Sequence, residues 1–227
     1  MNETSKLRTI RSFVLRQGRL TSSQQAAINQ YWPEYGLEPD RTFDPAATFG
    51  RKAPVVLEIG FGNGESLAQM AAASPEKDFI GIEVHRPGVG HLLLKIHELG
   101  LTNLRVYCTD AVEVLTSRIP DGCVAGIQVF FPDPWHKKRH NKRRLINAEF
   151  VEMATKKLSA GGIFHCATDW EDYAMQMLAE LEASQHLRNL AGEGHFAERP
   201  EHRPLTKFER RGHKLGHGVW DLMFEKI

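Results

Sequence analysis

Apolar residues occur along this chain in two kinds of pattern. Five short runs rich in apolar residues predict buried strands, over residues 55–59, 79–84, 104–108, 124–131 and 163–168. Between these runs, apolar residues recur at intervals of three and four, which is typical of helices with one buried face. Buried strands that alternate with helices predict βαβ units. We therefore expect an α/β fold with a mostly parallel sheet and helices on both faces.

Individual residues mark where several of these helices begin and end. Helical spacing predicts five helices, over residues 63–73, 87–99, 110–118, 146–158 and 174–181. Pro87 suits a first helical turn, Gly100 suits a helix end, and Asp110 can cap the helix that follows it. The Gly161-Gly162 pair predicts the end of the fourth helix.

The two ends of the chain differ in pattern from the middle. Residues 1–50 are basic at the start and contain three prolines later, which predicts a partly flexible extension with a helix over residues 22–31. Residues 51–227 then form the predicted domain. Within it, residues 191–218 are polar and rich in Arg and His, and long segments of this kind are usually functional or mobile. Residues 219–224 predict a last strand, at an edge or antiparallel.

The composition is that of an ordinary globular protein. The 227 residues contain 29 Lys and Arg against 28 Asp and Glu, so only the distribution of charge can indicate a nucleic-acid partner. No apolar run is long enough to cross a membrane, and no signal-peptide core follows the basic start. Cys108, Cys123 and Cys166 are widely spaced, which predicts buried thiols in a cytoplasmic protein rather than disulfides or a zinc site.

A glycine-rich turn follows the first predicted strand. Glu58 is followed by Gly60, Gly62 and Gly64, and these glycines allow a tight turn and the close approach of a ligand to the backbone. The spacing differs from the G-x-G-x-x-G pattern of dinucleotide-binding proteins. Taken alone, the turn is also compatible with a strand-to-helix connection that binds nothing.

Acidic residues end or follow the next three predicted strands. Glu83 lies about 20 residues beyond the turn, where an acid accepts hydrogen bonds from ribose hydroxyls. Asp110 can hold an adenine amine or cap a helix, and Asp133 follows the fourth strand. The carboxyl ends of parallel strands share one edge of a sheet. Acids at all four of these ends, with Glu58 as the first, therefore favour a binding site.

The glycine turn and these acids resemble the S-adenosylmethionine-dependent methyltransferases of the Rossmann-like class. The resemblance implies a seven-stranded sheet and S-adenosylmethionine as the cofactor. It places Glu58, Gly60 and Gly62 beside the methionine part, Glu83 at the ribose, Asp110 at the adenine, and Asp133 along the same pocket.

A stiff loop and a basic run follow the fourth predicted strand. Pro132 and Pro134 fix the direction of Asp133, and Trp135 offers a flat face on which a base can stack. Six of the nine residues 136–144 are Lys or Arg, and none is acidic. Each feature alone is compatible with a rigid loop or a solvated face. Their adjacency predicts that the run brings an RNA backbone to the reactive loop.

Several segments of the chain together resemble the bacterial tRNA (guanine-N7-)-methyltransferases, among them residues 11–21, 131–140, 167–169 and 206–209. This family methylates guanosine 46 in the variable loop of tRNA. The resemblance implies that Asp133 is the catalytic or substrate-orienting acid. It assigns substrate contacts to Lys137, Asp169, Thr206, Lys207, Phe208 and Glu209, and RNA contacts to Arg139, His140, Asn141, Lys142, Arg143 and Arg144.

The chemistry of guanine N7 limits what the acid must do. This nitrogen carries an in-plane lone pair, so no proton has to leave before attack and no strong general base is needed. Asp133 therefore either stabilises the positive charge of the methylated purine or holds the N1–H and N2 edge of the base.

Other interpretations remain open from the sequence. The loop around Asp133 also suits methylation of an exocyclic base amine, and a non-catalytic RNA-binding protein with a retained cofactor pocket is a further alternative. A nicotinamide-dependent oxidoreductase fits less well because the glycine spacing differs. His136 with His140, and His213 with His217, are four apart, but neither pair has a clear third ligand, so we expect no metal. Both a monomer and a homodimer are compatible with the sequence.

Overall fold

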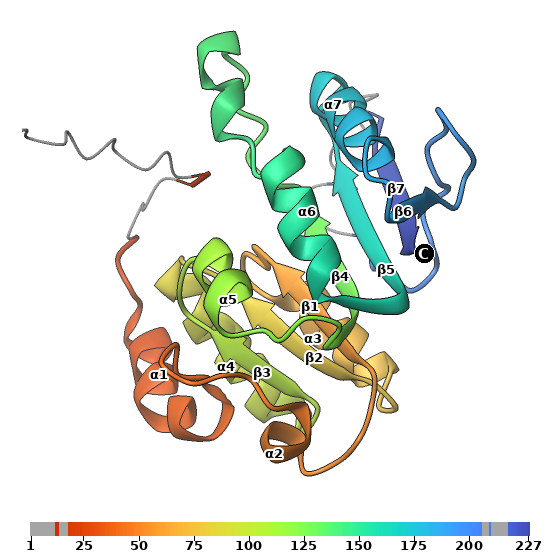
Figure 1. Cartoon of the computed structure of the whole chain (residues 1–227). Helices are drawn as coiled ribbons and strands as arrows, with labels where there is room; N and C mark the ends of the chain where they lie inside the picture. The colour runs from red at the N-terminus through yellow and green to blue at the C-terminus, as the bar shows by residue number, and fades with distance from the viewer. Residues whose placement is uncertain (1–11, 14–17, 206–208, 210–217) are drawn as a thin grey trace, which may run out of the picture.

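The computed structural model describes residues 12–13, 18–205, 209 and 218–227 of the chain. Within these residues, seven strands form a sheet in the order β3-β2-β1-β4-β5-β7-β6 (Figure 1). The strands are β1 Val55–Ile59, β2 Asp78–Ile82, β3 Leu104–Tyr107, β4 Val124–Phe130, β5 Leu158–Thr168, β6 Leu187–Asn189 and β7 Trp220–Lys226. The first five are parallel, and β7 runs antiparallel between β5 and β6. The predicted α/β fold with a mostly parallel seven-stranded sheet is confirmed.

Helices cover both faces of this sheet, as predicted. In the described chain they are α1 Ser22–Tyr35, α2 Pro45–Phe49, α3 Glu65–Ala73, α4 Arg86–Leu99, α5 Ala111–Ser117, α6 Ala148–Lys157, α7 Glu171–Glu182 and the 3-10 helix η1 Lys138–Arg143. Helices α3 and α4 bury their apolar residues on one face, and α5, α6 and α7 bury theirs on the other. Helix α1 packs on α4 (Figure 1).

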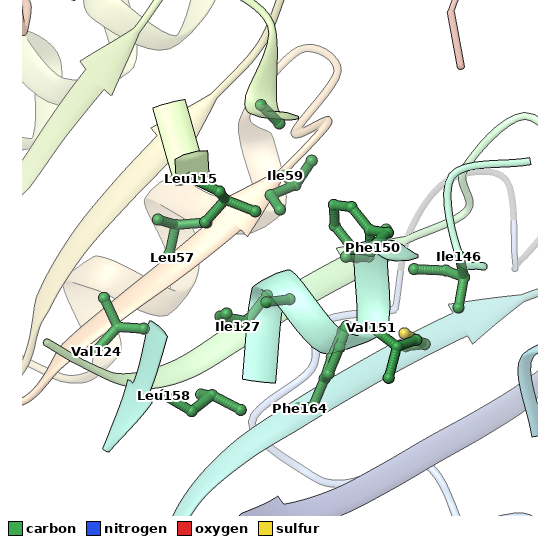
Figure 2. Packing of buried hydrophobic residues seen from close by; sticks show 14 of the residues in the cluster. Leu57, Ile59, Leu115, Val124, Ile127, Ile146, Phe150, Val151, Leu158 and Phe164 are labelled. Carbon is green, nitrogen blue, oxygen red and sulfur yellow. The ribbon is translucent and has the colours of Figure 1, made fainter. Parts of the chain in front are cut away.

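The larger apolar core lies between the sheet and helices α5 to α7. Figure 2 shows side chains from several elements meeting there, among them Leu57, Leu115, Ile127, Phe150 and Phe164. All five are buried. Strands that are buried on both faces explain why the sequence contains continuous apolar runs rather than alternating ones. The packed strands give their carboxyl ends a rigid support.

The described part of the N-terminal extension packs onto the domain. A capping box starts α1: the side chains of Thr21 and Gln24 each accept a hydrogen bond from the other residue's backbone N–H. The helix continues past the predicted end at residue 31 to Tyr35, although Pro33 lies inside it. Just after it, the Leu37 N–H donates to the Val106 carbonyl of β3 over 2.8 Å. The domain boundary near residue 50 stays a prediction.

The predicted end of the fourth helix was wrong. Helix α6 ends at Lys157, and Gly161 and Gly162 lie inside β5. Strand β5 already begins at Leu158, which pairs with Val124, and the register then shifts along β4. Leu158 is fully buried. An apolar residue at this position satisfies a helical pattern and a strand pattern equally, so the sequence alone did not separate them.

The sequence also missed β6. This strand has only three residues, which is too short for a recognisable period. It pairs with β7 and takes the edge of the sheet, so β7 lies between two neighbours. The predicted antiparallel alternative for the last strand is confirmed.

The cysteine thiols are free. Cys166 is buried, whereas Cys108 and Cys123 are half-buried, so the prediction of buried thiols holds fully for only one. Burial raises the pKa of Cys108 and Cys123. Among the described helices, none is long and apolar enough to cross a membrane.

Candidate active site

A cavity of about 220 Å³ lies at the carboxyl ends of β1, β2, β3 and β4. Its lining includes Gly60, Glu83, Asp110 and Asp133, which the sequence places after four different strands. Strand β1 pairs with β2 on one side and β4 on the other, so the chain reverses its winding direction here. In open parallel sheets this crevice is where ligands bind.

A second cavity of about 580 Å³ adjoins the first and extends it toward α1 and α4. The two share Phe13, Val84, Thr109 and Asp110 in their linings. Together they form an elongated space along the ends of β2 and β3. Such a space suits a ligand larger than the first cavity alone would hold.

The glycine turn presents bare backbone to this site. Gly60, Gly62 and Gly64 all have positive φ, between 61° and 76°, a conformation that favours glycine. A Cβ built at Gly60 or Gly62 would meet nothing within 4 Å, so the backbone faces open space there. The turn is also held from behind, because a Cβ on Gly88 of α4 would overlap the carbonyl oxygen of Gly62.

The carboxylate of Glu83 is fixed at the start of α4. One oxygen accepts hydrogen bonds from the backbone N–H groups of Val84 (2.7 Å) and His85 (2.9 Å), and the other accepts from Gly62 N–H (2.9 Å). The partial positive charge of a helix N-terminus favours an anion here. Glu83 therefore joins the glycine turn to the end of β2, and it also lines the cavity.

Asp110 caps a helix, which is one of the two roles that the sequence left open, and its position is also compatible with the other role at the cavity. Its carboxylate accepts a hydrogen bond from Val112 N–H over 2.9 Å and so caps α5. It also lines both cavities. Capping thus fixes the side chain in the position where a ligand would meet it.

Glu58 is placed differently from the other acids. The cavity lining contains Ile59 but not Glu58, because alternate residues of a strand point to opposite faces. The side chain is 3% exposed, and one of its carboxylate oxygens has no hydrogen-bond partner. Burial, with a smaller contribution from the charge of Glu83, raises the pKa of Glu58 to about 8. This raised pKa favours the protonated form of Glu58 near neutral pH.

This raised pKa predicts a specific pH dependence of stability. A carboxyl whose folded pKa lies above its unfolded value of 4.5 stabilises the fold most below that value and loses the effect as the pH rises toward 8. We expect Glu58→Gln to gain stability relative to the native chain, by up to ~1.4 kcal/mol per pH unit in this window. Urea unfolding at pH 5, 6.5 and 8.5 measures it. The exposed Glu76→Gln is the control, and a stability difference that does not change with pH would contradict the assignment.

The loop that carries Asp133 has an unusual backbone. Phe131 and Trp135 have positive φ, 51° and 48°, which costs a non-glycine residue about 1–3 kcal/mol. The Phe131 N–H is held by the Ala167 carbonyl at 2.8 Å, and prolines flank Asp133. Asp133 itself is exposed and lines the cavity. Surrounding contacts thus hold the loop in a conformation that directs this carboxylate at the site.

Arg144 does not lie on the surface with the rest of the basic run. It is 2% exposed, and its guanidinium donates to the Pro134 carbonyl (2.8 Å), Gln176 (2.7 Å) and Asp172 (2.6 Å). The structure therefore corrects its assignment as an RNA contact. Arg144 anchors the Asp133 loop to α7 from within the protein.

The rest of the basic run forms an exposed surface beside the cavity. Lys137, Lys138, Arg139 and Lys142 are exposed at η1, whereas His140, Asn141 and Arg143 are half-buried. The Arg143 guanidinium lies over the Trp135 ring, 3.9 Å from its centroid. These residues follow the Asp133 loop directly in the chain, so the basic surface adjoins a loop that lines the cavity.

The ring of Trp135 is less open than the sequence suggests. Arg143 covers one of its faces, and its indole N–H donates to the Ser12 carbonyl over 3.0 Å. Ser12 and Phe13 line the Asp133 cavity, although the sequence gave neither a role in it. The sequence did contain one indication of a role for them, because they lie in the basic segment of residues 11–21 that resembles the tRNA (guanine-N7-)-methyltransferases.

The remaining predicted substrate residues fall into three groups. Lys137 precedes η1, and Asp169 follows β5 at the same edge of the sheet; both are exposed. Glu209 is buried, and its side chain forms an ion pair with Arg203. Thr206, Lys207 and Phe208 lie outside the described residues, as do His213 and His217. No cluster of three or more potential metal ligands occurs in the part of the chain that the structure describes.

Comparisons with known proteins agree with this arrangement. The profile of a family described as putative methyltransferases matches residues 52–222. A tRNA (guanine-N(7)-)-methyltransferase of Methylococcus capsulatus is 60% identical over 219 residues, which cover 96% of this chain and 95% of the relative. One of the same name from Alcanivorax borkumensis is 59% identical over 226 residues, 99% of this chain and 95% of the relative. The chain belongs to the tRNA (guanine-N(7)-)-methyltransferase family.

Solved structures support the fold of this methyltransferase. The 16S rRNA methyltransferase KamB superposes with a TM-score of 0.59 at 18% identity, over 82% of this chain and 95% of that one. A methyltransferase of Aquifex aeolicus gives a TM-score of 0.51 at 16% identity, over 91% of this chain and 98% of that one. At such identities these likenesses concern the fold alone.

The site fits the cofactor of this enzyme, which is S-adenosylmethionine. Open backbone at Gly60 and Gly62 can approach the amino acid part closely. The fixed carboxylate of Glu83 can accept hydrogen bonds from ribose hydroxyls, and Asp110 lines both cavities. The prediction that these residues bind the cofactor is compatible with their geometry.

Proposed function

We propose that this methyltransferase transfers the methyl group of S-adenosylmethionine to N7 of guanosine 46 in the variable loop of tRNA, in the cytoplasm. The names of its relatives support the base atom and the class of RNA. The observation that carries the proposal is the exposed basic surface of η1, which adjoins the loop of Asp133 at the mouth of the cofactor cavity.

The chain's own residues would hold the cofactor along the strand ends. Gly60 and Gly62 would face the methionine part, Glu83 the ribose and Asp110 the adenine, as the family resemblance implies. S-adenosylmethionine supplies a methyl group on a positively charged sulfur, open to in-line attack. The protein contributes positioning, because guanine N7 already has its lone pair and needs no base.

Asp133 is the acid that would stabilise the reacting guanine. The methylated purine gains positive charge, and the exposed carboxylate at the cavity mouth lies where it can balance that charge or hold the base edge. The positive φ angles of Phe131 and Trp135, together with the contact from Arg144 to Pro134, fix the loop before substrate binds. A carboxylate placed in advance needs no rearrangement during the reaction.

A product map tests this proposal directly. We expect labelled methyl to enter an unmodified tRNA transcript, and borohydride reduction with aniline cleavage to cut the product at one guanosine of the variable loop. Incorporation without cleavage would move the target to another atom of the base. Absence of incorporation, in protein that binds S-adenosylmethionine, would contradict the proposed substrate.

The basic surface predicts a marked dependence of tRNA binding on salt. Removing two exposed charges by Lys138→Gln with Lys142→Gln should reduce the log–log slope of affinity against salt by about 0.7 to 0.9 for each lysine. Filter binding over a range of salt concentrations measures this slope. The paired control is Lys77→Gln with Lys156→Gln. These two exposed lysines lie near the amino ends of β2 and β5, whereas the cavity lies at the carboxyl ends of the strands. An equal change in both proteins would contradict a local RNA surface at η1.

A further inference from the structure

Trp170 is an exposed aromatic residue at the carboxyl edge of the sheet. It directly follows Asp169 and precedes α7, which begins just beyond the end of β5 (Figure 1). The residue is 38% exposed. Single exposed apolar residues are common on protein surfaces and indicate no ligand by themselves. What Trp170 can do therefore depends on how it is held and on what lies beside it.

The backbone of Trp170 is fixed at the start of α7. Its carbonyl accepts hydrogen bonds from the N–H groups of Tyr173 (3.0 Å) and Ala174 (2.9 Å). Its own N–H donates to Oγ1 of Thr168 over 3.3 Å. Thr168, Tyr173 and Ala174 are all buried. The indole thus extends from a rigid point of the fold rather than from a loose loop.

The ring of Trp170 packs against the loop that carries Asp133. It meets the imidazole of His136 edge to face, with the two ring centroids 4.2 Å apart. The pairing of β4 with β5 brings the two segments together, because Phe130 lies opposite Ala167. Asp133 and Trp170 each lie three residues beyond this pair. The indole therefore lies beside the Asp133 loop and close to the basic surface that follows it.

Trp135, the residue that the sequence favours for stacking on a base, is less available than Trp170. It is half-buried, and the Arg143 guanidinium lies over its ring. The imidazole of His140 lies 5.9 Å from it between ring centroids, and its indole N–H already donates to Ser12. Trp170 is the more open of the two rings that flank the Asp133 loop.

Methylation at guanine N7 requires an RNA segment in which the base is accessible. N7 lies on the major-groove edge of guanine, and the major groove of an RNA helix is too deep and narrow for side chains to enter. The reacting guanosine must therefore leave its stacked neighbours, and bases in such segments stack on aromatic side chains. Among the described residues, the lining of the Asp133 cavity includes Phe131 and Asp133 but not Trp170. The indole thus lies outside the space for the reacting group, where a neighbouring base would lie.

We propose that Trp170 stacks on the tRNA base next to the reacting guanosine, and that His136 is a positioning residue that holds the indole in place. The inference rests on the proposed function, since it concerns how the tRNA presents its guanine. The basic surface of η1 binds phosphates, and Trp170 replaces the stacking partner that the neighbouring base loses. Every base has a flat face, so this contact adds affinity without selecting a sequence.

Removing the ring should weaken the binding of tRNA. Stacking of one base on an aromatic side chain changes affinity by about 5-fold to 150-fold, so we expect Trp170→Ala to bind tRNA about 10-fold or more weakly. Trp170→Phe keeps an aromatic face and should stay within about three-fold of the native affinity. Filter binding measures both. The control is Leu99→Ala, which removes an exposed apolar side chain where α4 ends, at the opposite edge of the sheet. Native affinity in Trp170→Ala, or equal losses in the Ala and Phe variants, would overturn the proposal.

Synthetic tRNAs that each lack one base of the variable loop identify the stacking partner. The native chain should bind about 10-fold more weakly to the tRNA that lacks the base beside the methylated guanosine. Trp170→Ala should bind that tRNA and the intact one with affinities within about two-fold of each other, because the contact is already absent. Losses that multiply would overturn the proposal, as would a native chain that binds all of these tRNAs equally.

The same binding assay tests the role of His136. His136→Ala should weaken tRNA binding about three-fold or more, and His136→Phe, which keeps a ring against the indole, should restore most of the loss. In the Trp170→Ala background, His136→Ala should add less than about two-fold, because a positioning residue acts through the ring that it holds. Independent losses would overturn this role. None of these measurements involves methyl transfer. Coupling between Trp170 and a base in a protein that does not methylate N7 would therefore contradict only the proposed function, whereas methylation without coupling would contradict only this inference.

Discussion

Replacing Asp133 by asparagine should lower kcat for tRNA methylation by about 100-fold or more and leave the affinity for S-adenosylmethionine within three-fold. Removing one preorganised group that stabilises charge in a transition state has effects of this size. The amide keeps the shape of the side chain but loses the negative charge that balances the methylated purine. The cofactor cavity keeps Gly60, Glu83 and Asp110, so binding should persist. Single-turnover rates and calorimetric titration with the cofactor separate the two effects.

A surface aspartate provides the control for this experiment. Asp121 is exposed and pairs with Lys157 near the start of β5, far along the sheet from the cavity. Asp121→Asn should methylate tRNA at the rate of the native chain. An Asp133→Asn protein that turns over within a few-fold of the native rate would show that the carboxylate charge is not used.

Replacing Gly88 by alanine should reduce the affinity for S-adenosylmethionine by about 50-fold or more. The new Cβ would overlap the Gly62 carbonyl oxygen, so the glycine turn or α4 must move. Either movement disturbs the hydrogen bond from Gly62 N–H to Glu83. The overcrowding should also lower the free energy of unfolding by about 1–3 kcal/mol. This loss from overcrowding is larger than the gain of about 1 kcal/mol in the free energy of unfolding that alanine brings over glycine inside a helix.

Gly126 of β4 offers the same chemical change without the overlap. A Cβ there would meet Val56 at 3.6 Å, an ordinary contact, and its φ is not in the left-handed region. Gly126→Ala should therefore bind the cofactor as the native chain does. Equal losses in both variants would show that the effect does not come from the contact between α4 and the glycine turn. Calorimetric titration and urea unfolding of the two proteins give the comparison.

The placement of most cavity acids could be predicted from the sequence. Glu83, Asp110 and Asp133 each end or follow a parallel strand, and the rule that such ends share one edge was enough to bring them together. Glu58 is the exception. Its neighbours Leu57 and Ile59 belong to the core on the opposite face, so strand alternation already directs its side chain away from the cavity.

The two buried arginines could not be predicted in the same way. Arg144 lies in a basic run and Arg203 in a polar segment, and in both places the local pattern predicts a solvated side chain. Their burial depends on Asp172 and Asp221, which lie 28 and 18 residues away in the chain. Only the packing of α7 on the sheet and the pairing of β7 with β5 bring these carboxylates within reach. The residues next to each arginine in the sequence therefore do not predict its ion-pair partner.

The buried ion pairs that Arg203 forms with Asp221 and Glu209 also constrain how relatives of this enzyme diverge. Losing Arg203 would leave the two buried carboxylates without the cation that they share, and breaking a buried ion pair in this way destabilises a protein by about 3–5 kcal/mol. That is a large part of the 5–15 kcal/mol that holds a typical domain folded. A single replacement of Arg203 should therefore be selected against, and a change at this position should require further substitutions at Asp221 and Glu209. Across the family, the three positions should be inherited as a unit and covary where they change.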